Sequence, residues 1–168
     1  GESGLVALDW LGGNRNILGD ASLRAVMVGM TLATRPEEMY RAWIEATAFG
    51  LRVIMERYEE YGLTVRRICA GGGIAQKDPM LMQIYADVTG KEIRVTGTKQ
   101  AGALGSAMYA AVAGGIYPDI RAASVAMAPS DCAHYQPIPA NVSAYEPLYR
   151  TYRQLHDLFG GVRKDGSI

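Results

Sequence analysis

The sequence predicts an α/β domain that is rich in helices and contains a small parallel strand pair. The first observation is a strand-like run at Arg66–Ala70 that leads through Gly71–Gly73 into a helical pattern at Met80–Val88. The second observation is that another strand-like run, Glu92–Thr96, and another helical run, Gln100–Ala113, follow directly. Because strand, helix and strand alternate in this order, we expect the two strands to be parallel neighbours.

The composition is that of one globular domain, which we expect to span residues 1–168 with a loose tail at 162–168. Lys and Arg together number 17, as do Asp and Glu, so the formal net charge is zero and no surface for nucleic acid or an anionic membrane is predicted. No apolar run reaches the ~20 residues that a membrane span needs. The sequence shows no signal peptide, and together with free thiols this predicts a cytoplasmic protein.

Short elements precede the glycine turn. Leu5–Leu11 is apolar apart from Asp9, which fits a short strand or a loop docked on the core. Gly12–Asn16 is a loop by composition. Ala25–Met30 is a second short apolar run.

A long helix is expected to begin with a capping box. Thr34 is suited to the N-cap position, and Glu37 follows three residues later. The helical spacing of apolar residues continues to about Tyr61. We expect the side chains of Trp43 and Phe49 to lie in the core.

The last third of the chain predicts two more helices separated by an irregular segment. A short helix is expected from Asp119 to Ala126, and a final helix at Ser143–Phe159. The prolines between them predict irregular structure, with an extended piece at His134–Gln136.

The glycine turn has a possible chemical use. The N–H groups at the start of a helix suit a phosphate or another anion, and glycine lets a ligand approach the backbone. Gly71–Gly73 match neither G-x-x-x-x-G-K-[ST] nor G-x-G-x-x-G. At this point a plain strand-to-helix connection explains the glycines equally well.

The cysteines and histidines do not predict a metal site. Cys69 and Cys132 are far apart, and His134 and His156 form no cluster with them. Cys69 lies in the predicted strand, where we expect it to be a small buried hydrophobic residue.

Four stretches carry a resemblance to a known family. They are SGL…LDWLGGNR, LRAVMVGMTLATRPEEMYRAWIEATAFGLR, GGGIAQKDPMLMQIYADVTGKEIRV and QAGALGSAMYAAVAGG. In this order, across residues 3–160, they resemble the C-terminal domain of the FGGY carbohydrate kinases. Within that family, the resemblance is strongest to the sequences of the L-ribulokinases, through the segments GGIAQKD, DVTGKEI, LDWLGGNR and ATAFG. One departure is Trp43, which follows Ala42 where the family's second signature usually has a smaller residue.

The resemblance implies an actin-like, ribonuclease-H-like fold of two domains with a cleft between them. This chain would be the C-terminal, nucleotide-binding domain, truncated at its start and missing the N-terminal kinase domain as its partner. The implied reaction transfers the γ-phosphoryl group of ATP to L-ribulose or a related ketopentose in pentose or arabinose catabolism, with Mg²⁺ whose ligands are not identifiable in this chain. The family's catalytic Asp lies upstream of the matched region, so we assign no catalytic residue and expect the chain alone to be inactive.

The resemblance also assigns candidate site residues. Gly71, Gly72 and Gly73, with Lys77 and Asp78, correspond to the family's adenosine motif. Two further candidates, Asn14 and Arg15, lie in a loop that faces the cleft in the family, where the Arg15 guanidinium could meet a phosphate. A structural ion pair is the alternative role for Arg15, as it is for Arg24.

Two other functions stay open on the sequence alone. One is a non-catalytic, actin-like nucleotide-binding regulator or sugar-sensing module, because the catalytic Asp is not in the chain. The other is a small α/β protein whose glycines only turn the chain. If the chain is instead a fragment of the kinase, the strand at Arg66–Ala70 would lack the neighbours that it normally pairs with. Because an unpaired edge invites association, we expect a homodimer or a larger assembly of the isolated chain.

Overall fold

The computed structural model describes residues 1–129 and 133–161, and the predicted tail at 162–168 and Cys132 lie outside this range. The chain forms a two-stranded antiparallel sheet, a three-stranded mixed sheet and six helices within the described residues. In chain order the elements are β1 (Val6–Leu8), β2 (Val26–Val28), α1 (Pro36–Glu60), β3 (Arg67–Ala70), α2 (Gly73–Lys77), α3 (Pro79–Thr89), β4 (Glu92–Val95), α4 (Ala101–Ala113), α5 (Ile120–Met127), β5 (Ala133–Tyr135) and α6 (Pro139–Phe159).

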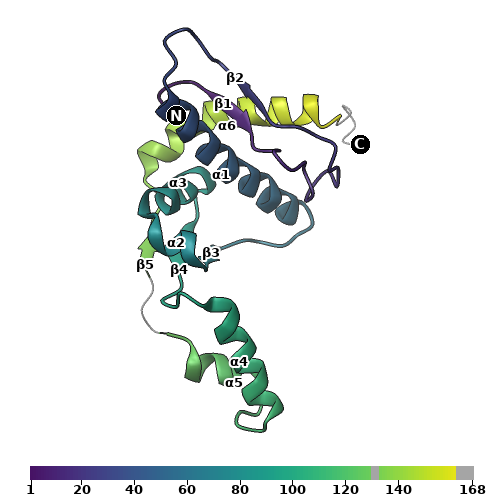
Figure 1. Ribbon diagram of the computed structural model, residues 1–168, viewed down its shortest axis with the longest axis vertical. Helices are drawn as coiled ribbons and strands as arrows, with labels where there is room; N and C mark the ends of the chain where they lie inside the picture. The colour runs from purple at the N-terminus through teal and green to yellow at the C-terminus, as the bar shows by residue number, and fades with distance from the viewer. Residues whose placement is uncertain (130–132, 162–168) are drawn as a thin grey trace.

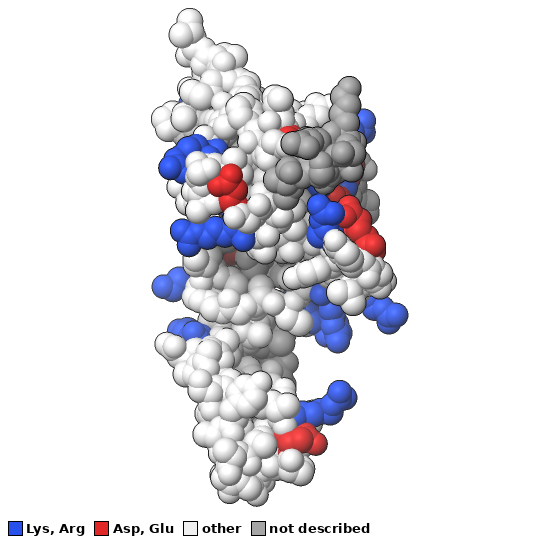
Figure 2. Space-filling view, turned by 90° about the vertical axis from the view of Figure 1, so that its right-hand side faces the viewer, with Lys and Arg blue, Asp and Glu red and all other residues white. Residues whose placement is uncertain are grey.

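The elements follow one another along an elongated molecule (Figure 1). The hairpin of β1 and β2 lies with α1 and α6 at one end, and α2, α3 and the second sheet lie in the middle. Helices α4 and α5 pack on each other and project at the opposite end. Figure 2 shows that this projecting end is mostly uncharged on the face in view. Most of the charged side chains on this face lie on the rest of the molecule.

The second sheet confirms the predicted parallel pair and enlarges it. Strands β3 and β4 are parallel, with Arg67 opposite Glu92, and β5 adds to the other side of β4 in the antiparallel direction. The strand order β3–β4–β5 leaves β3 at the edge within the described residues. The extended piece predicted near His134 is therefore a strand of this sheet.

The prediction for Cys69 is wrong, because its side chain is exposed. Successive side chains of a strand point to opposite faces. In β3 the neighbours Ile68 and Ala70 pack against the buried cluster of α2, α3 and β4, so Cys69 points the other way.

The start of α1 is displaced by one residue from the predicted capping box. The N-cap is Arg35 rather than Thr34, and its backbone N–H donates to Oε2 of Glu38, rather than Glu37, over 2.8 Å. Pro36 occupies the first helical turn, where a missing N–H has no consequence. The helix ends as predicted before Gly62, which has a φ of +79°.

An aromatic core joins β1, α1 and α6. Phe49 is buried as predicted, and its ring centroid lies 5.4 Å from that of Tyr152. Trp43 is only partly buried and packs against the edge of the same cluster. Tyr85 of α3 contacts this cluster and the smaller one around the second sheet, so it joins the two parts of the core.

Helix α6 begins at Pro139, which is earlier than the predicted start at Ser143. The extra turn is held by Asp87 of α3, which is buried. One oxygen of its carboxylate accepts the backbone N–H of Ile138 at 2.8 Å, and the other accepts the Asn141 amide at 2.8 Å. A carboxylate from a different helix therefore caps α6 at its N-terminus.

Candidate functional site

The glycine turn connects β3 to a short helix that the sequence did not predict. Gly72 has a φ of +97° and a ψ of 173°, a backbone conformation that is essentially confined to glycine. Helix α2 begins at Gly73 and has five residues, and the longer helix α3 begins only at Pro79. The helical pattern predicted at Met80–Val88 is α3, but the glycines lead into α2 instead.

The turn leaves open space beside its backbone. An ideal Cβ placed on Gly72 or Gly73 would meet no atom within 4 Å. A Cβ on Gly71 would lie 3.5 Å from the Thr96 hydroxyl oxygen and 3.5 Å from the Cβ of Ala101. A ligand could therefore approach the backbone at the second and third glycines, with the start of α4 beside the first.

The two polar candidates beside the turn differ in their surroundings. Lys77 is exposed at the end of α2. Asp78 is half-buried, and its carboxylate accepts the backbone N–H of Leu81 at 2.9 Å as the N-cap of α3. The ammonium group of Lys77 is free to meet a ligand, whereas Asp78 already has a structural partner.

Sequence reasoning missed two residues next to the turn. The amide of Gln76 donates to the carbonyl oxygen of Thr96 over 2.8 Å, which ties α2 to the end of β4. The Thr96 hydroxyl is buried and has no hydrogen-bond partner among the described residues. No local motif distinguishes Thr96, because its position depends on the pairing of β3 with β4.

Asn14 and Arg15 lie in the loop after β1, at a pocket of about 550 Å³. The backbone of Asn14 exchanges two hydrogen bonds of 2.8 Å with Asp20, and its side chain accepts the N–H of Leu18. The exposed Arg15 guanidinium donates to the carbonyl oxygen of Gly12 over 3.3 Å. Within the part of the chain that the structure describes, neither Arg15 nor Arg24 makes the alternative ion pair, and Arg24 donates to backbone carbonyl groups instead.

The inner wall of this pocket is polar. It contains the Asp9 carboxylate, the hydroxyl groups of Tyr85 and Tyr152, and the imidazole of His156. Burial raises the pKa of Asp9 above its ordinary value. Burial, with a further contribution from the negative charge of Asp9, raises the pKa of Tyr152, so this hydroxyl keeps its proton at neutral pH.

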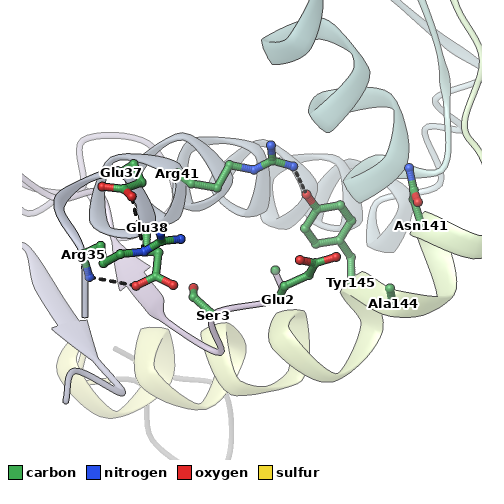
Figure 3. A pocket seen from close by; sticks show the side chains of 10 residues that line it. Glu2, Ser3, Arg35, Glu37, Glu38, Arg41, Asn141, Ala144 and Tyr145 are labelled. Atoms are coloured by element: carbon green, nitrogen blue, oxygen red, sulfur yellow. Dashed lines mark hydrogen bonds and ion pairs between the residues drawn. The ribbon is translucent and has the colours of Figure 1, made fainter. Parts of the chain in front are cut away.

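A second pocket, of about 620 Å³, lies between the N-terminal ends of α1 and α6 (Figure 3). Its charged groups are largely engaged with one another. Arg35 pairs with Glu37 at 3.3 Å, and Arg41 donates to the Tyr145 hydroxyl at 3.0 Å and to Glu45 at 2.8 Å. Arg35, Glu37 and Arg41 therefore already have partners within the chain.

Comparison with known proteins identifies the family. The sequence profile of the C-terminal domain of the FGGY family of carbohydrate kinases matches residues 2–114. The chain belongs to this family. A ribulokinase of Bacillus licheniformis is 50% identical over 164 residues, which are 95% of this chain and 30% of that protein. A ribulokinase of Halalkalibacterium halodurans is 49% identical over 169 residues, covering 98% of this chain and 30% of that protein.

Solved structures of FGGY sugar kinases share the fold. A gluconate kinase from Lactobacillus acidophilus superposes with a TM-score of 0.77 at 26% identity, covering 94% of this chain and 31% of that one. A xylulose kinase from Rhodospirillum rubrum gives a TM-score of 0.75 at 24% identity, covering 93% of this chain and 30% of that one. These similarities confirm the predicted helix-rich α/β fold of the actin-like ATPase class. The FGGY chain described here spans about 30% of the length of the curated relatives that it matches.

The structure adds one finding on membranes. None of the described helices of this FGGY chain is both long and apolar enough to cross a bilayer.

Proposed function

We propose that the whole protein is an ATP-dependent sugar kinase that phosphorylates L-ribulose or a related ketopentose. The observation that carries this proposal is the identity of 50% with a ribulokinase over 95% of the chain. Solved FGGY kinases at lower identity include enzymes for xylulose and gluconate. The similarity to ribulokinases therefore supports the choice of sugar, and it favours a catalyst over the non-catalytic regulator.

The glycine turn is proposed to bind the adenosine and α-phosphate side of ATP. The open space at Gly72 and Gly73 supports this role, because a nucleotide could lie against their backbone. Phosphoryl transfer depends mainly on positioning and charge stabilisation, so backbone groups suffice for this part of the site. Lys77 would add one positive charge, and Asp78 would hold the start of α3 in place.

Arg15 and Asn14 are proposed to face the interdomain cleft of the whole protein. The support is the exposure of the Arg15 guanidinium, which contacts only a backbone carbonyl group among the described residues. A fixed positive charge in this position suits the phosphate groups of a bound nucleotide.

Magnesium is expected to accompany ATP in such a kinase. Among the described residues no group of three or more His, Cys, Asp or Glu side chains could hold a metal ion. No magnesium ligand is therefore assigned among the described residues.

The test is an ADP-release assay on the full-length protein with a panel of L-ribulose, D-ribulose, D-xylulose and glycerol. We expect the highest kcat/KM with L-ribulose and no turnover by the 168-residue chain alone. Preference for another sugar would correct the substrate, and the absence of ADP release with every sugar would refute the kinase function.

The same protein is proposed to be cytoplasmic, and the isolated chain is proposed to self-associate through the exposed edge of β3. Sedimentation velocity of the isolated chain tests the second point. A monomer at tens of micromolar, on the order of ordinary assay concentrations, would contradict it.

A further inference from the structure

Gln76 of α2 makes a contact that the proposed function does not use. Its side-chain amide donates to the backbone carbonyl oxygen of Thr96 over 2.8 Å, although the two residues are 20 positions apart in the sequence. The glycine turn lies between β3 and α2, and Thr96 follows directly after β4. This hydrogen bond therefore joins the chain beyond the turn to the end of the neighbouring strand.

Thr96 also holds the chain that leads into the turn. Its backbone N–H donates over 2.9 Å to the carbonyl oxygen of Ala70, the last residue of β3. This bond continues the parallel pairing of β3 with β4, which fixes the position of Thr96. Thr96 therefore bonds to the chain on both sides of Gly71–Gly73, through its N–H before the glycines and through its carbonyl oxygen after them.

Helix α2 depends on contacts with other elements for its position. It has five residues, whereas a helix of fewer than ~12–15 residues is only marginally stable by itself in water. Ala75, which packs in the cluster of α3 and β4, is the buried residue of this helix. Ile74 is 72% exposed, and Lys77 is exposed as well. The hydrogen bond from Gln76 is therefore a large part of what holds α2 against the sheet.

The glycines make this hydrogen bond important for a ligand. Gly72 has a φ of +97° and a ψ of 173°, and glycine loses more backbone freedom on folding than any other residue. Three successive glycines do not keep one conformation without further contacts. The two hydrogen bonds to Thr96 restrict the turn to the conformation in which Gly72 and Gly73 face open space.

We propose that Gln76 is a positioning residue for the nucleotide, because its bond to Thr96 keeps the glycine turn in the conformation that receives ATP. This role rests on the proposed placement of the nucleotide at the turn. Gln76 acts through the backbone of Thr96 rather than by contact with the nucleotide. A turn that adopts the binding conformation for only a fraction of the time binds ATP more weakly in proportion to that fraction.

The principal variant is Gln76→Met in the full-length protein. Methionine resembles glutamine in length and helix propensity, is uncharged and has no N–H donor in its side chain. An ADP-release assay with L-ribulose gives kcat and the KM values for ATP and for the sugar. We expect KM for ATP to rise about two- to fivefold, as loss of one neutral hydrogen bond would give. The sugar KM and kcat should keep their parent values, because bound ATP itself holds the turn in place.

The matched control is Gln83→Met. The amide of Gln83 in α3 also donates to a backbone carbonyl oxygen of another segment, that of Gln136, over 2.9 Å. It donates to Oδ1 of Asp87 as well, over 2.8 Å, so this variant should lower the melting temperature at least as much as Gln76→Met. KM for ATP should nevertheless keep its parent value, which distinguishes positioning of the turn from a general loss of stability.

Hydrogen exchange without nucleotide, followed by mass spectrometry, measures the turn directly. The backbone amides of the segment 71–78 should exchange about two- to fivefold faster in Gln76→Met than in the parent, and at the parent rate in Gln83→Met. The proposal would be overturned by an unchanged exchange rate or an unchanged KM for ATP in folded Gln76→Met, or by an equal rise of KM in both variants. If the parent releases no ADP with any sugar, the kinase function is refuted instead, and the exchange rates still decide whether Gln76 holds the turn.

Discussion

Alanine substitutions at two neighbouring glycines of the glycine turn distinguish the effect of backbone strain from the effect of ligand contact. Gly72→Ala places a Cβ on a residue with a φ of +97° and a ψ of 173°, which costs an L-residue about 1–3 kcal/mol. Gly73→Ala introduces the same methyl group one residue later, where φ is not positive and no atom lies within 4 Å of the new Cβ. The second change should alter the free energy of unfolding by less than about 1 kcal/mol, in the stabilising direction.

Gly73→Ala should lower the affinity for a nucleotide without lowering the stability of the fold. If ADP lies against the open backbone of the turn, the methyl group of Gly73→Ala should weaken its binding by at least about tenfold, which is about 1.4 kcal/mol. Urea unfolding measures the stability of both variants, and calorimetry with ADP on the full-length protein measures affinity. The parent affinity in a folded Gly73→Ala variant, with Gly105→Ala as the control, would refute the placement of the nucleotide at this turn.

Three further results are expected. Asp87→Ala should destabilise the fold by about 3 kcal/mol in urea unfolding, because it removes the buried carboxylate that caps α6. Asp87→Asn should destabilise it less, since the amide retains one acceptor oxygen. Equal losses of stability in the two variants would argue against the cap. Because burial raises the pKa of Asp9, the folded state holds this proton more tightly than the unfolded state and stability falls as pH rises above about 4. The stability gain of Asp9→Asn should therefore grow between about pH 4 and 7, and a gain that is constant with pH would contradict the burial of that charge. Cys69 should react with a thiol reagent in the native protein, and a native labelling rate unchanged in Cys69→Ser would contradict its exposure.

The parts of the fold that local chemistry determines were predictable. The strand–helix–strand unit follows from alternating periodicity, and β3 and β4 are parallel as expected. The start of α6 was not predictable, because its cap is Asp87, a residue 51 positions before Ile138 in the sequence. The exposure of Cys69 also depends on which face of β3 meets the core, and one four-residue strand does not reveal that face.

The candidate sites also differ in how far the sequence alone predicts them. The glycine turn is visible in the sequence because its residues are contiguous, and glycine is required at Gly72 by the backbone itself. The polar wall of the other pocket is not visible, since Asp9 and His156 come from opposite ends of the chain. Only the packing of α6 on β1 and α1 brings them to one pocket.

Two buried polar atoms of the described residues lack a hydrogen-bond partner. Within residues 1–129 and 133–161, the buried side-chain atoms without a hydrogen-bond partner are the Thr96 hydroxyl and Nε2 of His156. Leaving a buried polar group unsatisfied costs about 1–3 kcal/mol, so folded proteins rarely keep one without a ligand or a water molecule to satisfy it. One of these atoms lies beside Gly71 and the other in the pocket with Asp9. If ADP binds at the glycine turn of the folded protein, it should raise the melting temperature of the full-length protein, and calorimetric melting with and without ADP measures this shift.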